Sequence, residues 1–312
     1  MEREKALPWP GGREAEKQPS AAVRRGKDAV EFGVQLIFLL CGFVAVGCVL
    51  FICIYLIVAG LPAILEIGLT DFLFGTVWNG REDQFGILPF ILTSVAGTAG
   101  AVLIGVPIGL MTAMFLAKVA PEGVARVIRT AVELLAGIPS IVYGLVGMIV
   151  LVPAIQKAFQ LSSGATLLAA IVVLAIMILP SIVNVAETSL RAVPREYEEA
   201  SLALGATHIE TIFRVTLPAA RSGVATAVVL GVGRAIGEAM AIIMVSGNVP
   251  NMPQSLFTPV RFLTTAVASE MSYAGVGTLW RQALYSVGLV LFLFIMIINV
   301  ILNVFIKNKK EG

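Results

Sequence analysis

Six apolar runs, each about 20 residues or longer, constrain the fold of this chain more than any other feature of its sequence. A helix of about 20 apolar residues crosses the roughly 30 Å hydrocarbon core of a bilayer. A transmembrane barrel would instead need shorter strands of alternating polarity. The expected fold class is therefore an all-α integral membrane protein with about six transmembrane helices, at residues 32–60, 88–117, 125–153, 166–185, 223–245 and 283–306.

Composition agrees with a membrane location and limits the chemistry available to the chain. Charged residues make up 13% of the sequence, against roughly 25% in soluble domains, and mean hydropathy is +0.92. A chain with so much apolar surface is expected to be surrounded by membrane lipid. Its net charge of +2 indicates neither a nucleic acid nor an acidic partner. The single histidine, His208, excludes a histidine-based metal or catalytic site, and no catalytic residue is assigned. Cys41, Cys48 and Cys53 lie in the first apolar run and are interpreted as packing residues.

The distribution of Lys and Arg predicts the orientation of the chain. With the N-terminus inside, 17 of these residues fall in inner segments and four in outer segments, or ten against four without the N-terminal tail. The positive-inside rule then places both termini in the cytoplasm. We expect a disordered cytoplasmic tail over residues 1–30, a transmembrane domain over 31–306 and a short tail over 307–312. A cleaved signal peptide is the competing interpretation of the N-terminus, but the first apolar run is too long for one.

Two outer segments, at residues 61–87 and 247–280, are longer than minimal connections require. Residues 257–271 of the second segment place apolar side chains on one helical face, which predicts a helix at the membrane surface. We expect both segments to contact a partner outside the membrane.

The cytoplasmic segment at residues 187–221 has the capping residues of two short helices. Pro194 suits the first turn of a helix, and Gly205 suits a left-handed position that ends it. Thr207 and Glu210 have the spacing of a capping box, which begins a second helix, and Pro218 marks where that helix stops or bends. The segment is therefore predicted to form a helix–glycine–helix corner rather than an ordinary loop.

This corner resembles the EAA loop of ABC importer permeases. The family pattern is Glu-Ala-Ala, then Gly, then Ile-x-Leu-Pro at a later fixed offset; Ser201 replaces the second Ala. The resemblance implies a type I (MetI-like) permease fold and a loop that docks on a cytoplasmic ATPase. The residues it implies for ATPase coupling are Glu199, Ala200, Ser201, Leu204, Gly205, Ile212, Leu217 and Pro218.

Four further segments resemble permeases of the phosphate-import (Pst) system, in particular its C-type subunits: residues 85–89, 133–144, 233–241 and 257–260. The resemblance implies a second permease (PstA-like), a dimer of ATP-binding subunits (PstB-like) and an extracytoplasmic phosphate-binding protein (PstS-like) as partners. The chain has no Walker A sequence. It is therefore expected not to be an enzyme and to bind no cofactor, with ATP and Mg held by the partner ATPase.

Candidate residues of a substrate path lie in the third and fifth apolar runs. A half-helix that begins after Pro139, at Ser140, would direct its positive end toward an anion at mid-membrane; a packing kink is the alternative. Arg234 and Glu238 are four residues apart, so we expect them on one helix face, where they either line the path or pair with each other.

Three alternatives to a phosphate permease remain at this stage. The first is a permease for another oxyanion, such as molybdate or sulfate, because the segment around Arg234 is shared with those permeases. The second is a secondary transporter or channel that works alone, which would need no ATPase-docking corner. The third is an intramembrane enzyme, but Arg234 and Glu238 are the only charged residues deep in a span.

Overall fold

A computed structural model describes residues 21–308, with side-chain surroundings given for residues 31–301 and Val304. The regular secondary structure of the described chain is helical except for a two-stranded hairpin. It divides into two compact units, Met1–Ile54 and Tyr55–Gly312. Within residues 21–308, five helices could each cross a membrane by length and composition, or six if one bent pair is counted as a single span, in agreement with the predicted all-α membrane fold.

The helix α1 (Ala21–Ile67) runs from the first unit into the second. Residues 32–54 of this helix are apolar except for Gln35, and almost all of them are exposed; Phe38 and Phe43, for example, are 71% and 70% exposed. Such a helix is suited to lipid. The helix begins at Ala21, so the prediction of a disordered tail is wrong for residues 21–30, while residues 1–20 and 309–312 lie outside the described residues. The three cysteines are free thiols.

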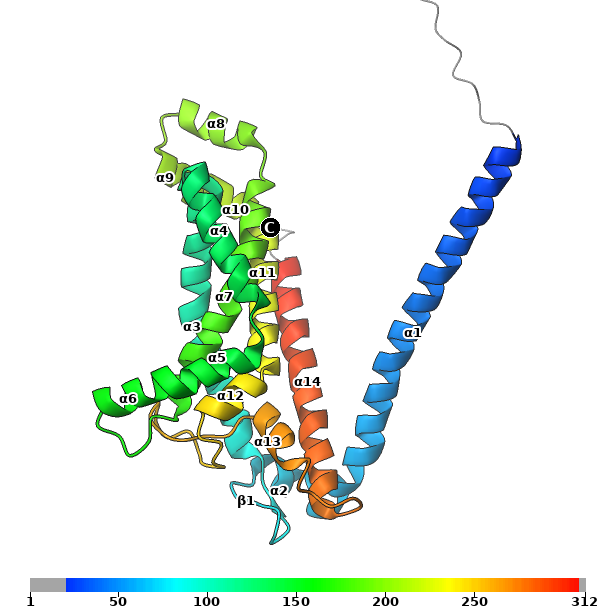
Figure 1. Ribbon diagram of the computed structural model, residues 1–312, viewed down its shortest axis with the longest axis vertical. Helices are drawn as coiled ribbons and strands as arrows, with labels where there is room; N and C mark the ends of the chain where they lie inside the picture. Colours follow the sequence, from blue (N-terminus) through cyan, green and yellow to red (C-terminus); the bar gives the residue numbers. More distant parts are fainter. Residues whose placement is uncertain (1–20, 309–312) are drawn as a thin grey trace, which may run out of the picture. The chain divides into compact units, whose positions relative to one another are not determined.

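Close packing of α3 (Leu88–Met114) against α7 (Leu167–Arg191) forms the centre of the second unit. An added Cβ at Gly100, Gly105 or Gly109 of α3 would come within 2.7–2.8 Å of an isoleucine side chain of α7. Small residues allow this approach, as is common between helices in membranes. The buried α7 isoleucines are Ile171, Ile178 and Ile182. The helix α14 (Leu279–Asn308) packs against α11 (Arg221–Gly237) and α13 (Leu263–Glu270) (Figure 1).

The predicted third span, residues 125–153, is wrong in its boundaries. An amphipathic helix α4 (Glu122–Gly137) ends before Pro139, and Ile138 is extended with φ −71° and ψ 126°. The reason is that the ring of a proline disfavours helical geometry in the residue before it. The apolar span is instead Ser140–Ala158. It consists of α5 (Ser140–Val146), a π-helical turn η2 (Gly147–Leu151) and α6 (Val152–Ala158).

The predicted fifth span, residues 223–245, is also broken. The helix α11 (Arg221–Gly237) ends where Glu238 becomes extended, with ψ 128°, and α12 (Met240–Val245) follows. The preceding cytoplasmic helix, His208–Ala219, meets α11 at a bend of 75°. This bend comes just after Pro218, as the sequence predicts.

The outer segments and the cytoplasmic corner lie at opposite ends of the second unit (Figure 1). One end holds α2 (Leu69–Phe74), the hairpin of β1 (Trp78–Asn79) with β2 (Gln84–Phe85), and α13 (Leu263–Glu270). The prediction of a surface helix over residues 257–271 is wrong, because α13 is shorter and its first four residues are buried in the protein. The other end holds α8 (Arg195–Ala203), α9 (His208–Thr211), a π-helical turn η3 (Ile212–Thr216) and α10 (Leu217–Ala219).

Candidate functional site

The corner between α8 and α9 is built by the predicted caps. Gly205 has φ +86°, a left-handed conformation that glycine adopts without steric cost. Its amide donates to the Leu202 carbonyl at 2.9 Å, and the next amide, of Ala206, donates to the Ser201 carbonyl at 3.3 Å. This pair of hydrogen bonds is a Schellman motif, which satisfies carbonyls that the end of α8 leaves free.

The start of α9 is fixed by the predicted capping box. The Thr207 hydroxyl accepts from the Glu210 amide at 3.3 Å, while the Glu210 carboxylate accepts from the Thr207 amide at 3.0 Å. Because the Thr207 amide and hydroxyl both donate to the charged carboxylate, they lower the pKa of Glu210 below its usual value. Two separately capped helices therefore fix the angle of the corner.

Polar contacts hold the corner against the end of the second span. Lys118 lies in the π-helical turn η1 (Phe115–Val119) that follows α3, and its ammonium forms an ion pair with Glu198. The backbone carbonyl of Lys118 lies 3.0 Å from Nε2 of His208, and the Ser201 and Thr211 hydroxyls are 2.9 Å apart. No sequence pattern pairs Lys118 with Glu198, because the two residues are 80 positions apart in the chain.

The predicted coupling residues divide into an exposed group and an inner group. Leu204 is 90% exposed and Ile209, which was not predicted, is 67% exposed. Ile212 is only 4% exposed, so its side chain packs against the body of the protein. Glu199, Ala200, Gly205 and Pro218 are exposed, whereas Ser201 and Leu217 are half-buried. An apolar, fully exposed leucine at the tip of a rigid corner is suited to contact with another protein.

The second cluster of predicted residues surrounds the break between α11 and α12. The Arg234 guanidinium donates to the Ser181 hydroxyl of α7 at 3.1 Å. Glu238 does not continue the helix, so the prediction that it shares a helix face with Arg234 is wrong. No ion pair joins the two within the described part of the chain. They nevertheless lie close in the chain, at the end of one helix and in the break after it.

Glu238 has its own partners on both sides of the break. Its carboxylate accepts from the Ala241 amide at 3.1 Å, which caps the start of α12. Its backbone carbonyl accepts from the Thr264 hydroxyl of α13 at 2.8 Å. The break is therefore stabilised by hydrogen bonds that replace those of a continuous helix, as backbone at membrane depth requires.

The predicted break at Pro139 is confirmed, since α5 begins at Ser140. The Tyr143 hydroxyl donates to the Leu135 carbonyl of α4 at 2.7 Å, which satisfies an acceptor at the end of that helix. Pro180, by contrast, lies inside α7 without interrupting it.

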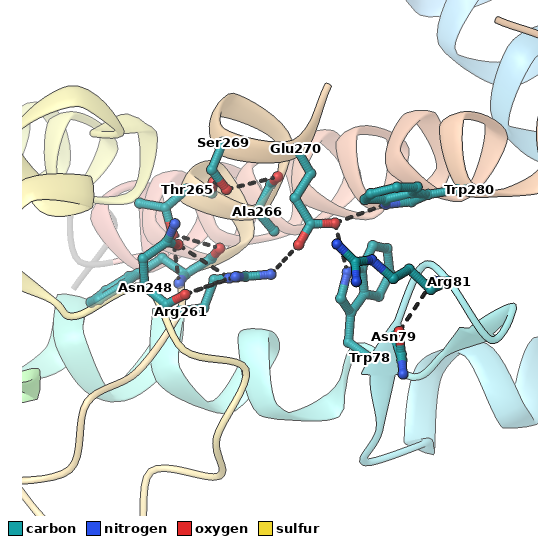
Figure 2. A network of polar contacts seen from close by, with 11 residues as sticks. Trp78, Asn79, Arg81, Asn248, Arg261, Thr265, Ala266, Ser269, Glu270 and Trp280 are labelled. Carbon is teal, nitrogen blue, oxygen red and sulfur yellow. Dashed lines mark hydrogen bonds and ion pairs between the residues drawn. The ribbon is translucent and has the colours of Figure 1, made fainter. Parts of the chain in front are cut away.

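A network of polar contacts joins the outer segments (Figure 2). One oxygen of the Glu270 carboxylate accepts from the indole nitrogens of Trp78 and Trp280, each at 2.8 Å. The other oxygen forms an ion pair with Arg261, and Arg261 donates to the Asn248 backbone carbonyl at 2.7 Å. The network connects the first outer segment, the second outer segment and the start of α14. No periodicity or motif predicts this network, because hydrogen-bonded partners within it are up to 192 residues apart.

The family described as "Binding-protein-dependent transport system inner membrane component" matches residues 105–310, two thirds of the chain and the whole region of the corner and the two breaks. The chain belongs to this family. It is accordingly a multi-pass protein of the inner membrane. Membership supports a transport permease that works with a binding protein, and nothing in the comparisons supports a transporter that works alone or an intramembrane enzyme.

Individual relatives cover most of the permease. It is 38% identical over 284 residues to the "Probable ABC transporter permease protein YqgH" of Bacillus subtilis. This match covers 88% of this chain and 92% of that protein. It is 37% identical over 264 residues to the "Phosphate transport system permease protein PstC" of Pasteurella multocida, with 78% and 82% covered. The PstC protein of Haemophilus influenzae is 36% identical over 262 residues, with 77% and 82% covered.

Solved structures share the fold of the permease at low identity. A chain of a bacterial alginate ABC transporter, in complex with a periplasmic protein, superposes with a TM-score of 0.60 at 16% identity and covers 90% of this chain and 93% of its own. A chain of the inward-facing MetNI methionine ABC transporter gives 0.57 at 21% identity, with 71% and 95% covered. The predicted type I permease architecture is thereby confirmed.

Proposed function

We propose that this chain is a transmembrane permease subunit of an ATP-driven phosphate importer. The observation that carries the proposal is the 36–37% identity to PstC phosphate permeases over more than three quarters of the chain. The geometry of the breaks suits an oxyanion in general, so it supports transport of this class of substrate without selecting phosphate from sulfate or molybdate.

The corner of α8 and α9 is the proposed contact with a cytoplasmic ATPase. Its rigid caps and its exposed Leu204 allow a movement of the ATPase to be passed to the spans as a unit. The Lys118–Glu198 ion pair connects the corner to α3, and the 75° bend connects it to α11. ATP and Mg are bound by the ATPase, a dimer in this proposal.

Arg234 is the proposed contact for the anion in mid-membrane. A guanidinium has five N–H donors, and the bond to Ser181 fixes its direction while using one of them. The remaining fork matches two oxygens of a phosphate. Glu238 and the helix start at Ser140 belong to the same proposed path, in which Glu238 accepts a hydrogen bond from a protonated phosphate. Fully ionised sulfate has no such proton.

The second permease and the external phosphate-binding protein complete the proposed assembly. The outer end of the chain suits the binding protein, because the Glu270 network holds three outer elements in one arrangement. Tyr273 and Val276 follow Glu270 in the chain and are 78% and 87% exposed.

Uptake of ³²P-phosphate by cells that lack other phosphate permeases tests the proposal. We expect uptake only when this chain and its ATPase are both expressed, with competition by arsenate and none by sulfate or molybdate. Uptake of labelled molybdate or sulfate in place of phosphate would identify a permease for another oxyanion.

A further inference from the structure

The face of α7 that follows Ser181 toward the cytoplasmic corner is polar and accessible. Asn184, Thr188 and Arg191 follow Ser181 at spacings of three, four and three residues, which places all four on one side of the helix. None of the four is buried, while Ile182, Ala186 and Leu190 between them are at most 2% exposed. The face therefore begins at the partner of Arg234 and extends along about 15 Å of helix.

This face opens into a cavity of about 480 Å³ at the cytoplasmic end of α7. Asn184, Thr188 and Arg191 line it from α7, and Arg129 lines it from α4. Arg129 and Arg191 are not part of the corner, and none of the proposed roles above uses them. The cavity lies beyond Ser181 in the direction in which an imported anion would leave.

Both arginines are held by one buried carboxylate. A single oxygen of Glu187 accepts from Arg129 at 2.6 Å and from Arg191 at 2.9 Å. The Glu187 side chain is 6% exposed, but those of Arg129 and Arg191 are 37% and 49% exposed. Two cations thus share one anion and keep a large part of their surface in the cavity.

The remaining contacts leave donors for a ligand. Arg191 also donates to the Leu116 carbonyl at 2.8 Å, which fixes its position. The contacts to Glu187 and Leu116 occupy three of the ten N–H groups of the two guanidiniums. Glu133 also lines the cavity, but it is exposed, so its side chain can turn away at small cost.

We propose that Arg129 and Arg191 form a release-side binding site for a tetrahedral oxyanion, in competition with Glu187. This inference rests on the proposed function, in which the anion is phosphate. An anion that leaves Arg234 passes along the polar face of α7 and is bound by both guanidiniums. Glu187 then returns to the arginines as the anion departs, which keeps the site weak enough to release its ligand.

Equilibrium binding of ³²P-phosphate tests this site in the complete complex in lipid nanodiscs, without nucleotide and without the binding protein. We expect the R129Q/R191Q double variant to bind phosphate at least about tenfold more weakly, since charge-assisted hydrogen bonds to both arginines are lost. Arg126→Gln is the matched control, because Arg126 is an exposed arginine of the same helix outside the cavity. It should bind as the wild type does.

Glu187→Gln separates a binding site from a purely structural clamp. Removal of the competing charge should tighten phosphate binding several-fold, whereas loss of a clamp would lower thermal stability and leave phosphate binding unchanged. If the double variant fails to assemble, Arg129→Lys keeps the charge beside Glu187 and should still weaken binding, because an ammonium lacks the planar fork.

The same panel distinguishes failure of this inference from failure of the proposed function. Equal phosphate binding by all variants, in a complex whose wild type imports phosphate into cells, would overturn the release site and leave the function standing. If the wild type imports sulfate or molybdate instead, the proposed function fails, and binding of that anion is measured for the same variants. Weaker binding of that anion by R129Q/R191Q supports an oxyanion site at the two arginines. Equal binding overturns the site.

Discussion

Arg234 and Ser181 are the pair of side chains on which the proposed anion contact depends. Arg234→Lys should lower phosphate uptake by about tenfold or more, because lysine offers a point charge in place of a planar bidentate fork. Initial rates of ³²P-phosphate uptake, normalised to membrane content by immunoblot, measure this. Arg221→Lys on the same helix is the control, since Arg221 is exposed. Equal rates for both variants would remove Arg234 from the path.

Loss of Glu270 should lower the stability of the folded protein, whereas loss of Arg234 should lower phosphate uptake. Its side chain and that of Arg261 are 14% and 13% exposed. Removal of one partner from such a pair leaves an uncompensated charge and costs about 3 kcal/mol. Glu270→Gln should therefore lower the thermal unfolding temperature of the purified complex by several degrees, while Glu82→Gln, at an exposed position of the first outer segment, should not. An unchanged unfolding temperature for Glu270→Gln would contradict the role of the network.

The corner of α8 and α9 gives a prediction at the scale of an element. A Gly205→Val variant must adopt φ +86° with a branched side chain, at a cost of about 1–2 kcal/mol or more. The corner should lose its angle, so that ATP is hydrolysed without matching uptake of phosphate. Ala203→Val, two residues earlier at the last helical position of α8, should retain coupling. The ratio of phosphate imported to ATP hydrolysed is the measurement, and a wild-type ratio in Gly205→Val would contradict the proposed role.

The outer end of the chain gives a second prediction at this scale. Cysteines at Tyr273 or Val276 should form crosslinks to the binding protein during turnover, because these are the most exposed large hydrophobic side chains of the second outer segment. A cysteine at Val260, which is fully buried, is the control and should form none. Lack of crosslinks from the exposed positions would place the binding protein elsewhere.

The sequence predicted the elements that depend on local rules. The caps at Gly205 and Thr207 and the break at Pro139 each follow from the chemistry of one or two adjacent residues, and the structure has all three. The break at Glu238 was missed because no proline marks it; it is held by the Ala241 amide and by Thr264, and the latter is 26 residues away.

At the scale of the whole molecule, hydropathy identified the number and class of the spans but not all of their limits. Apolar residues continue across the break after Gly137, so composition alone joined the amphipathic α4 to the true span that begins at Ser140. Long-range contacts could not be predicted from the sequence, because they depend on how the helices pack. The ion pair of Lys118 with Glu198 and the indole bonds to Glu270 exist only because the helices pack as they do.

Transport of phosphate by this permease in an ATP-driven complex can be measured as ³²P-phosphate uptake by proteoliposomes that contain this chain, its partner permease, the ATPase and the binding protein. We expect uptake that requires both ATP and the binding protein and that is lost in Arg234→Lys. Phosphate uptake without ATP, or ATP-driven uptake of another oxyanion in its place, would contradict the proposed function.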